Sequence, residues 1–170
     1  YGLTDRGGSN GSGTIFEYDV SLSTYTKLLD FDGSNGSRPK GSLLEASNGS
    51  LYGLTQEGGT NNEGVIFEYE IGTTTYTVHF NFDSTVSGRW PYGSFIEASN
   101  GLLYGMTENG GINFDGVLFQ FNTATDTYTK LMDFDTEGSP HGTLIEASNG
   151  NLYGLTLLGG ANSAGAIFEY

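Results

Sequence analysis

The chain repeats the same motifs at a regular interval, and this repetition constrains its fold more than any other feature. The motif YG(L/M)T begins at Tyr1, Tyr52, Tyr104 and Tyr153. A second motif, (I/L)F(E/Q)(Y/F), keeps the same interval and begins at Ile15, Ile66, Leu118 and Ile167. A period of about 50 residues is typical of a four-stranded propeller blade and longer than that of common helical repeats.

Each repeat reads as four short β-strands. In the second repeat we expect them at residues 41–47, 51–56, 65–70 and 75–82. In the last of these, Tyr76, Val78 and Phe80 alternate with polar residues, which is the period of a strand. Asn48 and Gly49 connect the first two strands and predict a two-residue type I′ turn, because such turns place Asn-Gly at positive φ. No stretch has an apolar stripe at helical spacing, so the sequence predicts almost no helix.

The predicted fold is therefore all-β, a β-propeller built from four-stranded antiparallel blades. One repeat array spans 1–170 and divides into a partial blade with strands two to four (1–32), two complete blades (41–83 and 92–135) and a partial blade with strands one to three (141–170). About 3.5 blades are fewer than the roughly 4–8 blades that close a propeller ring. We therefore expect the array to contact further repeats of its own chain or copies of itself.

Aromatic side chains supply the expected core. Tyr and Phe number 11 each, and both side chains bury large apolar areas. One Phe recurs in the second motif of every repeat, at Phe16, Phe67, Phe119 and Phe168. We expect all four to lie buried between blades.

The charge and the missing cysteines exclude several classes of function. The formal net charge is −14, with only six Lys plus Arg residues. Nucleic acid requires a basic footprint, so it is excluded as a partner. No apolar run reaches the length of a transmembrane helix, and we expect no membrane insertion. The chain has no Cys, which excludes disulfides, thiolate metal sites and cysteine nucleophiles.

The sequence offers no set of residues typical of catalysis. The two histidines, His79 and His141, lie in different repeats and at different positions of the unit. No G-x-S-x-G motif occurs. Glutamates that recur at one repeat position, as at Glu45, Glu97 and Glu146, are expected to belong to the scaffold. We therefore expect that the protein is not an enzyme.

Candidate ligand-binding residues lie in loops that differ between repeats. The loops DGSNGSRPK, DSTVSGRWPY and DTEGSPH precede the first strands, and in a propeller they share a face with the Gly-rich loops between strands two and three. Variable loops on a fixed scaffold are common places for binding. The candidates are Arg89, Trp90, Tyr92 and His141, since an exposed aromatic pair can stack on a sugar ring or anchor a protein partner. For Trp90 the alternative is a packing role at the end of a blade.

One phrase suggests a cation site. DFDGSNG offers oxygen atoms at Asp30, Asp32 and Ser34, and Ca²⁺ takes about 6–8 oxygen ligands. Calcium is the only cofactor that the sequence suggests. The alternative is structural, with carboxylates at the strand end accepting hydrogen bonds from backbone N–H groups.

Three Asn-Gly-Ser sequons are candidate glycosylation sites. They begin at Asn10, Asn35 and Asn48. In a eukaryotic secretory chain such sequons can carry glycans. The alternative for Asn48 is its role as a turn residue.

The whole repeat has a family resemblance. It reads PxGSLxEASNGxLYGLTxxGGx(4)GxIFEY followed by YTxL, and this pattern resembles the GloVer (Gloeobacter/Verrucomicrobia) tandem repeat over essentially the whole chain. It is more distantly similar to kelch repeats, with Gly58-Gly59, Tyr69 and Tyr76 at comparable places and Tyr where kelch has Trp. The resemblance implies a β-propeller, an extracellular or cell-surface location on bacteria, and no assigned catalytic chemistry.

These observations together predict a non-catalytic extracellular repeat protein. Its variable loops would serve adhesion or ligand recognition, with a carbohydrate or another surface protein as partner. The first alternative is a structural subunit of an extracellular fibre or surface layer. The second is a fragment of a carbohydrate-active enzyme whose catalytic residues lie in other repeats.

Overall fold

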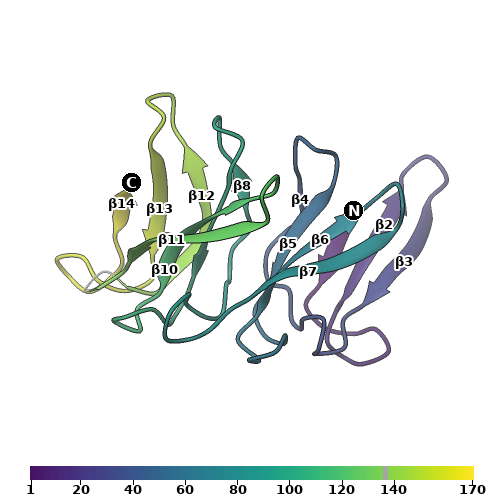
Figure 1. Ribbon diagram of the computed structural model, residues 1–170, viewed down its shortest axis with the longest axis horizontal. Helices are drawn as coiled ribbons and strands as arrows, with labels where there is room; N and C mark the ends of the chain where they lie inside the picture. Colours follow the sequence, from purple (N-terminus) through teal and green to yellow (C-terminus); the bar gives the residue numbers. More distant parts are fainter. Residues whose placement is uncertain (136–137) are drawn as a thin grey trace.

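The chain forms four small antiparallel sheets that follow one another across the molecule in chain order (Figure 1). The computed structural model describes residues 1–135 and 138–170, and within them it contains strands and turns but no helix. The second and third sheets have four strands each, and the first and fourth have three. The predicted all-β class is therefore confirmed. None of the described residues forms a helix long and apolar enough to cross a bilayer.

In every sheet, strands that are consecutive in sequence are neighbours. The first sheet contains β1 (Gly2–Thr4), β2 (Thr14–Asp19) and β3 (Thr24–Asp30). The second contains β4 (Leu44–Glu45), β5 (Leu51–Thr55), β6 (Val65–Glu70) and β7 (Thr75–Asn81). The third contains β8 (Ile96–Glu97), β9 (Leu103–Thr107), β10 (Val117–Asn122) and β11 (Thr127–Asp133). The fourth contains β12 (Pro140–Glu146), β13 (Leu152–Thr156) and β14 (Ile167–Glu169).

The first strand of the second repeat is shorter than the sequence predicts. Residues 41–47 were expected to be extended along their own sheet, but only Leu44–Glu45 pair there as β4. The reason lies in the neighbouring repeat, because the backbone N–H of Ser42 donates to Ser94 Oγ at 2.7 Å instead of joining its own sheet. The prediction is wrong at this point because inter-repeat hydrogen bonds replace ladder hydrogen bonds.

The two repeated motifs are complementary halves of one packing unit. Gly53 of the first motif pairs across the β5–β6 ladder with Phe67 of the second. A Cβ on Gly53 would lie 2.3 Å from Phe67 Cζ, so the ring covers the glycine and no larger residue fits. The same register recurs in the other three sheets as the pairs Gly2 and Phe16, Gly105 and Phe119, and Gly154 and Phe168. The repeat therefore has a glycine at this position because the end of a phenylalanine ring occupies the space that a side chain would need.

The threonine that ends the first motif fixes the start of the third strand. Thr55 Oγ1 accepts a hydrogen bond from the backbone N–H of Val65 at 3.1 Å and donates to Glu57 O at 2.9 Å. Thr55 is fully buried, so these bonds form away from solvent, where an unpaired hydroxyl would be costly. Thr107 makes the equivalent pair of bonds in the third sheet.

The Ser-Asn-Gly turn differs from the predicted two-residue hairpin. Ala46 N–H donates to Ser50 O at 2.9 Å, and Gly49 N–H donates to Ala46 O at 2.8 Å. Gly49 has φ of 84°, whereas Asn48 is not among the residues with positive φ. The connection is therefore a three-residue loop, in which a type I turn is followed by a left-handed glycine. The Asn48 side chain contributes by accepting from Ser50 N–H at 3.1 Å.

The hydrophobic core lies between successive sheets. At each junction the Phe that follows the fourth strand of one repeat meets the motif Phe of the next, edge to face. The three contacts join Phe31 to Phe67 at 5.4 Å, Phe82 to Phe119 at 5.3 Å, and Phe134 to Phe168 at 4.9 Å between ring centroids. This geometry is favoured for aromatic pairs, because the positive edge of one ring faces the negative face of the other.

The prediction that four recurrent Phe residues are buried is confirmed for two of them. Phe67 and Phe119 have no exposed surface. Phe16 and Phe168 are only partly buried. For Phe16 the difference arises because no other sheet packs on its face of the first sheet. Phe168 packs on Phe134 of the third repeat, but the three-stranded fourth sheet has no counterpart of Tyr76 and Tyr128, which pack on Phe67 and Phe119.

Candidate ligand-binding site

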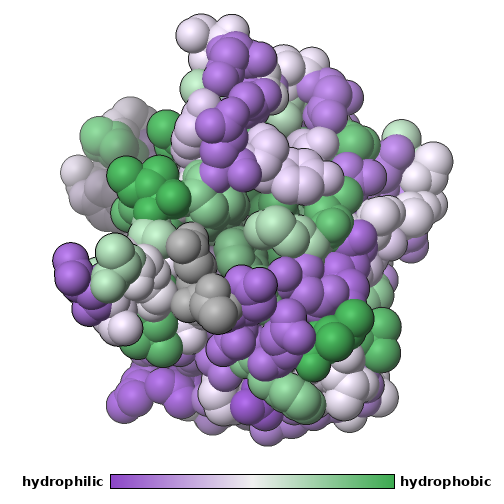
Figure 2. All heavy atoms as spheres, turned by 90° about the vertical axis from the view of Figure 1, so that its left-hand side faces the viewer, coloured by the Kyte–Doolittle hydropathy of each residue, from purple (hydrophilic) through white to green (hydrophobic). Residues whose placement is uncertain are grey.

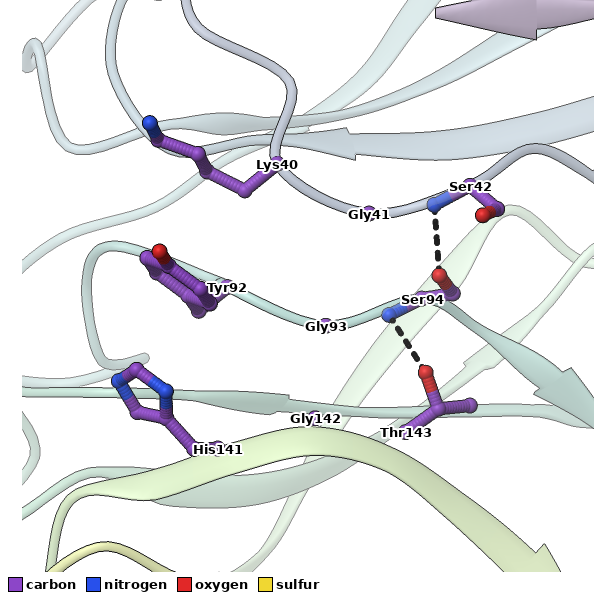
Figure 3. Close-up of a pocket in the computed structure, with 9 residues that line it drawn as sticks. All are labelled: Lys40, Gly41, Ser42, Tyr92, Gly93, Ser94, His141, Gly142 and Thr143. Atoms are coloured by element: carbon purple, nitrogen blue, oxygen red, sulfur yellow. Dashed lines mark hydrogen bonds between the residues drawn. The ribbon is translucent and has the colours of Figure 1, made fainter.

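Three consecutive repeats each contribute the same triplet, X-Gly-Ser/Thr, to one depression of about 470 Å³ (Figure 3). The residues that line it are Lys40, Gly41, Ser42, Tyr92, Gly93, Ser94, His141, Gly142 and Thr143. The first two triplets end two residues before the first strands of the second and third sheets begin, and the last lies within β12. The depression therefore lies where the first strands of three sheets come together.

The residue three positions before each glycine joins neighbouring sheets through its backbone. Trp90 donates its N–H to Glu63 O of the second sheet's loop, and its own carbonyl accepts from Glu108 N–H beside the third sheet, each at 3.1 Å. This requires a left-handed backbone, with φ of 57°. Arg38 and Ser139 have φ of 54° and 56° and make the equivalent pairs of bonds. Such a conformation costs about 1–2 kcal/mol in a residue with a Cβ, and the two hydrogen bonds between sheets offset it.

These bonds also place the variable loops of the repeat together. The loop before the first strand contacts the loop between the second and third strands, as the bond from Trp90 N–H to Glu63 O shows. Two residues of the loop before β12, Thr136 and Glu137, lie outside the described residues.

Glycines allow the three triplets to lie unusually close to one another. A Cβ on Gly41 would lie 2.3 Å from Gly93 O, and a Cβ on Gly93 would lie 1.8 Å from Gly142 O. The third triplet residues then form a ladder, in which Ser42 N–H donates to Ser94 Oγ at 2.7 Å and Ser94 N–H donates to Thr143 Oγ1 at 3.2 Å. The floor of the depression is therefore a fixed scaffold shared by all three repeats.

The first triplet residue differs in each repeat and gives the depression its chemistry. The rings of Tyr92 and His141 stack with centroids 4.3 Å apart and planes 26° from parallel. Lys40 Nζ lies over the Tyr92 ring, 6.0 Å from the ring centroid. It also forms an ion pair with Asp5 at 2.8 Å. His141 Nε2 is buried without a hydrogen-bond partner and lies 3.6 Å from Glu108 Oε1. The depression thus combines an aromatic ring, an ammonium group and an imidazole.

The structure separates the four predicted ligand-binding residues into two pairs. Tyr92 and His141 line the depression together, as Figure 3 shows. Arg89 and Trp90 are not among its lining residues and pack on each other, with the Arg89 guanidinium 4.1 Å from the Trp90 ring centroid. Arg89 also lies 3.9 Å from Glu63, so this pair belongs to the junction between the second and third sheets.

Sequence reasoning missed Lys40 as a lining residue. The signal was present, because Lys40-Gly41-Ser42 stands at the same repeat position as the triplets that begin at Tyr92 and His141. Aligning the repeats on the glycine, rather than searching for aromatic residues, identifies all three positions.

The residues predicted to bind a cation have separate hydrogen-bond partners. Asp30 accepts from Lys27 Nζ at 2.6 Å and from Ser9 N–H at 3.1 Å, and the hydrogen bond from Lys27 lowers the pKa of the Asp30 carboxyl. Asp32 Oδ1 accepts from Ser34 Oγ at 2.7 Å in the turn that follows. Within the described residues no group of three or more His, Cys, Asp or Glu side chains is placed to hold a metal ion. Calcium binding by Asp30, Asp32 and Ser34 stays a prediction.

The structural alternative for the strand-end acceptors has direct support. Asn81 and Asp133 occupy the repeat position of Asp30. Asn81 Oδ1 accepts from Thr60 N–H, and Asp133 Oδ1 accepts from Ile112 N–H, each at 2.8 Å. In each repeat this side chain therefore anchors the Gly-Gly loop to the fourth strand.

The three sequon asparagines donate hydrogen bonds from their side-chain amides. Asn10 Nδ2 donates to Phe31 O at 3.2 Å, Asn35 Nδ2 to Asp30 O at 3.3 Å, and Asn48 Nδ2 to Tyr52 Oη at 3.0 Å. Asn61 and Asn113, which are not sequons, make the same bond as Asn10. The amides therefore have structural roles in the repeat, and glycosylation at Asn10, Asn35 and Asn48 stays a prediction.

The other histidine links two sheets at a distance from the depression. His79 Nε2 lies 2.8 Å from Glu68 Oε2, and His79 Nδ1 lies 2.8 Å from Asp126 Oδ1 in the β10–β11 hairpin. Burial acts to raise the pKa of Glu68, but hydrogen bonds from Ser50 and His79 leave that pKa below its usual value. The equivalent positions in the first and third repeats are Leu28 and Leu131, so this polar link is specific to one junction.

Solved structures share the arrangement of sheets at low sequence identity. TolB from Acinetobacter baumannii is 14% identical, with a TM-score of 0.59 over 93% of this chain and 35% of its own. The extracellular domain of a hybrid two-component system from B. thetaiotaomicron is 15% identical, with a TM-score of 0.57 over 94% of this chain and 19% of its own. The extracellular domain of a one-component system from the same organism is 14% identical, with a TM-score of 0.58 over 83% of this chain and 17% of its own. The chain thus spans about a third or less of these proteins, and the likeness is one of fold.

The repeat family is shown by the sequence itself. No curated protein matches the chain. The model of the Gloeobacter/Verrucomicrobia repeat, in contrast, matches residues 1–168, which include all four copies of the first motif and the recurrent Phe of every second motif. The glycine–phenylalanine pairs and the X-Gly-Ser/Thr triplets described above lie within this match. The chain belongs to the Gloeobacter/Verrucomicrobia repeat family.

Proposed function

We propose that this chain is a non-catalytic, extracellular recognition module whose ligand binds in the depression lined by Lys40, Tyr92 and His141. The four sheets would be blades of a kelch-like β-propeller, with the depression near its axis. One observation carries the proposal: three repeats place a different side chain at one shared position, above a floor of glycines and hydroxyl side chains linked by hydrogen bonds. A fixed scaffold with variable side chains is the common design of a binding site.

The chemistry of the depression favours a carbohydrate as ligand. An aromatic ring such as Tyr92 offers an apolar face with a polar hydroxyl at its edge. The ammonium of Lys40 and the imidazole of His141 flank that ring and can hydrogen-bond to sugar hydroxyls. Small-ligand sites commonly combine apolar surface with a few polar groups in this way.

The same geometry argues against a catalytic role for His141. A histidine that activates a nucleophile as general base requires a hydroxyl or thiol within its hydrogen-bond reach. Among the described residues, His141 Nε2 has no such partner and faces the carboxylate of Glu108 instead. Binding without turnover is therefore the proposed activity.

The extracellular location is proposed on two grounds. Two of the solved structures with this fold are described as extracellular domains. The chain also carries a net charge of −14 and no Cys, a composition compatible with secretion by bacteria. Fractionation of cells of the native organism, with an antibody against this chain, tests the location directly.

Glycan binding of matched variants tests the proposed site. The wild-type chain is applied to a glycan array beside Tyr92→Ala, His141→Ala and the off-site control Trp90→Ala, after thermal melts confirm that each is folded. We expect the first two to lose at least about tenfold in affinity, equivalent to 1.4 kcal/mol, while the control retains binding. Absence of binding by the wild-type chain, or equal loss in the control, would overturn the proposal.

A further inference from the structure

The fourth sheet exposes aliphatic side chains on the face that points away from the third sheet. Ile145, Leu155 and Ile167, one from each of its strands, have exposed fractions of 63%, 56% and 75%. They line a hollow of about 270 Å³ together with Tyr153. Figure 2 looks onto this end of the molecule and shows hydrophobic residues in the middle of the face, with hydrophilic ones along much of its edge. We call this surface, formed by Ile145, Leu155 and Ile167, the aliphatic face.

The same positions are buried inside the molecule, which shows what covers them. Leu54 and Ile66 of the second sheet correspond in the repeat to Leu155 and Ile167, and they are exposed by only 2% and 0%. They belong to one cluster with Phe119 and Phe121 of the third sheet. An aliphatic face in this fold is therefore covered by the aromatic face of the next sheet.

The first sheet carries such an aromatic face without a partner sheet. Tyr18 and Tyr25 are exposed by 49% and 55%, and Phe16 packs against Tyr25 with ring centroids 5.3 Å apart. Their counterparts in the second sheet, Phe67 and Tyr69, are buried in a cluster with Ile15 and Phe31 of the first sheet. We call the surface formed by Phe16, Tyr18 and Tyr25 the aromatic face.

We propose that two copies of this chain associate head to tail, with the aliphatic face of one copy packed on the aromatic face of the other. The contact would continue the order of the three internal junctions, where each sheet's aliphatic face meets the aromatic face of the next. It differs from a contact between like faces, because each internal junction joins the side of one sheet that carries the counterparts of Leu155 and Ile167 to the side of the next sheet that carries its motif Phe. Exposed apolar patches of this kind are a common mark of an interaction site.

The occupant is a second copy because both halves of the contact are present on one chain. A heterologous contact of this type gives a ring where the rotation closes and a longer polymer where it does not. The net charge of −14 opposes the approach of two copies. We therefore expect association to strengthen as salt screens this repulsion. Lys40, Tyr92 and His141 of the proposed ligand-binding depression lie on neither face, and Thr143 alone lines both the depression and the hollow.

Complementation between face variants tests both the association and its polarity. The aliphatic-face variant is Leu155→Lys with Ile167→Lys, and the aromatic-face variant is Tyr18→Lys with Tyr25→Lys. A matched control, Val86→Lys with Ile112→Lys, changes two exposed apolar loop residues on neither face. Sedimentation is followed from about 1 to 100 µM, a range that brackets micromolar dissociation constants.

We expect the mass of the wild-type chain and of the control to rise above that of a monomer as concentration increases. Each face variant alone should remain monomeric. An equal mixture of the two face variants should form a 1:1 dimer, because each supplies the face that the other lacks. A wild-type chain that stays monomeric throughout the range would overturn the proposal, as would a mixture of face variants that fails to associate.

Discussion

The inner and outer sheets of this molecule use the same motifs but differ in how completely those motifs are buried. Phe67 and Phe119 in the second and third sheets have no exposed surface, whereas Phe16 and Phe168 in the first and fourth are partly exposed. Each ring nonetheless lies over the glycine of its own sheet. A single repeat thus fixes the local packing of ring on glycine, and the neighbouring repeats complete the burial.

This difference has an energetic consequence. A domain of small sheets gains most of its stability from apolar area removed from water, at about 25 cal/mol per Å². Repeat arrays bury that area in contacts between neighbouring repeats. A repeat with one neighbour is therefore stabilised by about one interface, and a repeat with two neighbours by two. The inner sheets should therefore be the most stable part of the molecule.

The largest expected effect is the loss of an inner aromatic ring. Phe119→Ala should reduce the free energy of unfolding by about 3–5 kcal/mol, because it removes a fully buried ring and leaves a cavity. Phe168→Ala should cost about half as much, since that ring is partly exposed and its site can relax. Urea unfolding measures both free energies. Equal losses in Phe119→Ala and Phe168→Ala would contradict the proposed difference between inner and outer sheets.

A smaller effect is expected where repeats approach most closely. Gly93→Ala would place a Cβ 1.8 Å from Gly142 O, so the backbone of one repeat must move. Such overpacking costs about 1–3 kcal/mol. The matched change is Gly142→Ala, whose Cβ would have nothing within 4 Å and which carries only the cost of a φ of 86°. Urea unfolding should show a lower midpoint for Gly93→Ala, and the reverse order would contradict the packing described for the depression.

Buried tyrosines should make the inner sheets sensitive to alkali. Tyr128 Oη donates to Ser87 O at 2.8 Å, and burial, followed by the charge of Asp133, raises the pKa of the Tyr128 hydroxyl. A tyrosine in the unfolded chain ionises at about pH 10. As the pH rises, the unfolded state therefore releases this proton before the folded state does. The stability due to Tyr128 is present below about pH 10 and is lost as the pH rises beyond it.

The substitution Tyr128→Phe isolates this contribution. It should cost about 0.5–1.5 kcal/mol at neutral pH through the lost hydrogen bond, and it should reduce the fall in stability above pH 10. The control is Tyr25→Phe in the exposed aromatic face, which should change neither value. Urea unfolding at neutral and alkaline pH measures the cost of the substitution and the fall in stability above about pH 10. If stability falls as steeply with pH in Tyr128→Phe as in the wild-type chain, Tyr128 is not the source of the alkaline sensitivity.

The smallest effect is expected at the recurrent glutamate. Glu97 accepts hydrogen bonds from the backbone N–H and the hydroxyl of Ser47 in the preceding repeat. Among the described residues, Glu45 at the same repeat position has no such serine facing it. Glu97→Ala should cost up to about 1 kcal/mol, limited by the exposure of the bonds, and Glu45→Ala should be neutral. Thermal melts that rank them in the opposite order would show that the link contributes nothing.

The sequence predicted the features that depend on spacing within one repeat. The strand at residues 65–70 was placed at its observed bounds, and those expected at 51–56 and 75–82 end one residue earlier, at Thr55 and Asn81. Alternation and motif interval are local properties, so they are readable without knowledge of the fold. The turn after Ala46 was misassigned because Asn-Gly fits two loop types, and only the Ala46–Ser50 bond distinguishes them.

Features that depend on contacts between repeats were not predictable in the same way. Residues 41–43 were expected to pair within their sheet, yet Ser42 bonds to Ser94 across a junction. Trp90 was selected as a ligand-binding residue because an exposed aromatic pair can stack on a sugar, with packing at the end of a blade as the alternative. Its backbone and ring lie at a junction between sheets. Tyr92 and His141 were both selected as ligand-binding residues and they line one depression, although nothing in their separate sequences shows that their rings stack.

The central claim is that neighbouring repeats, rather than the repeat itself, determine the stability of each sheet. Hydrogen exchange at about 0.1 µM, below the range of micromolar dissociation constants, tests it by comparing the β5–β6 ladder with the β13–β14 ladder. The account predicts that β5 and β6 exchange only through global unfolding, while β13 and β14 exchange faster through local opening of the fourth sheet. Equal protection of the two ladders would contradict the account.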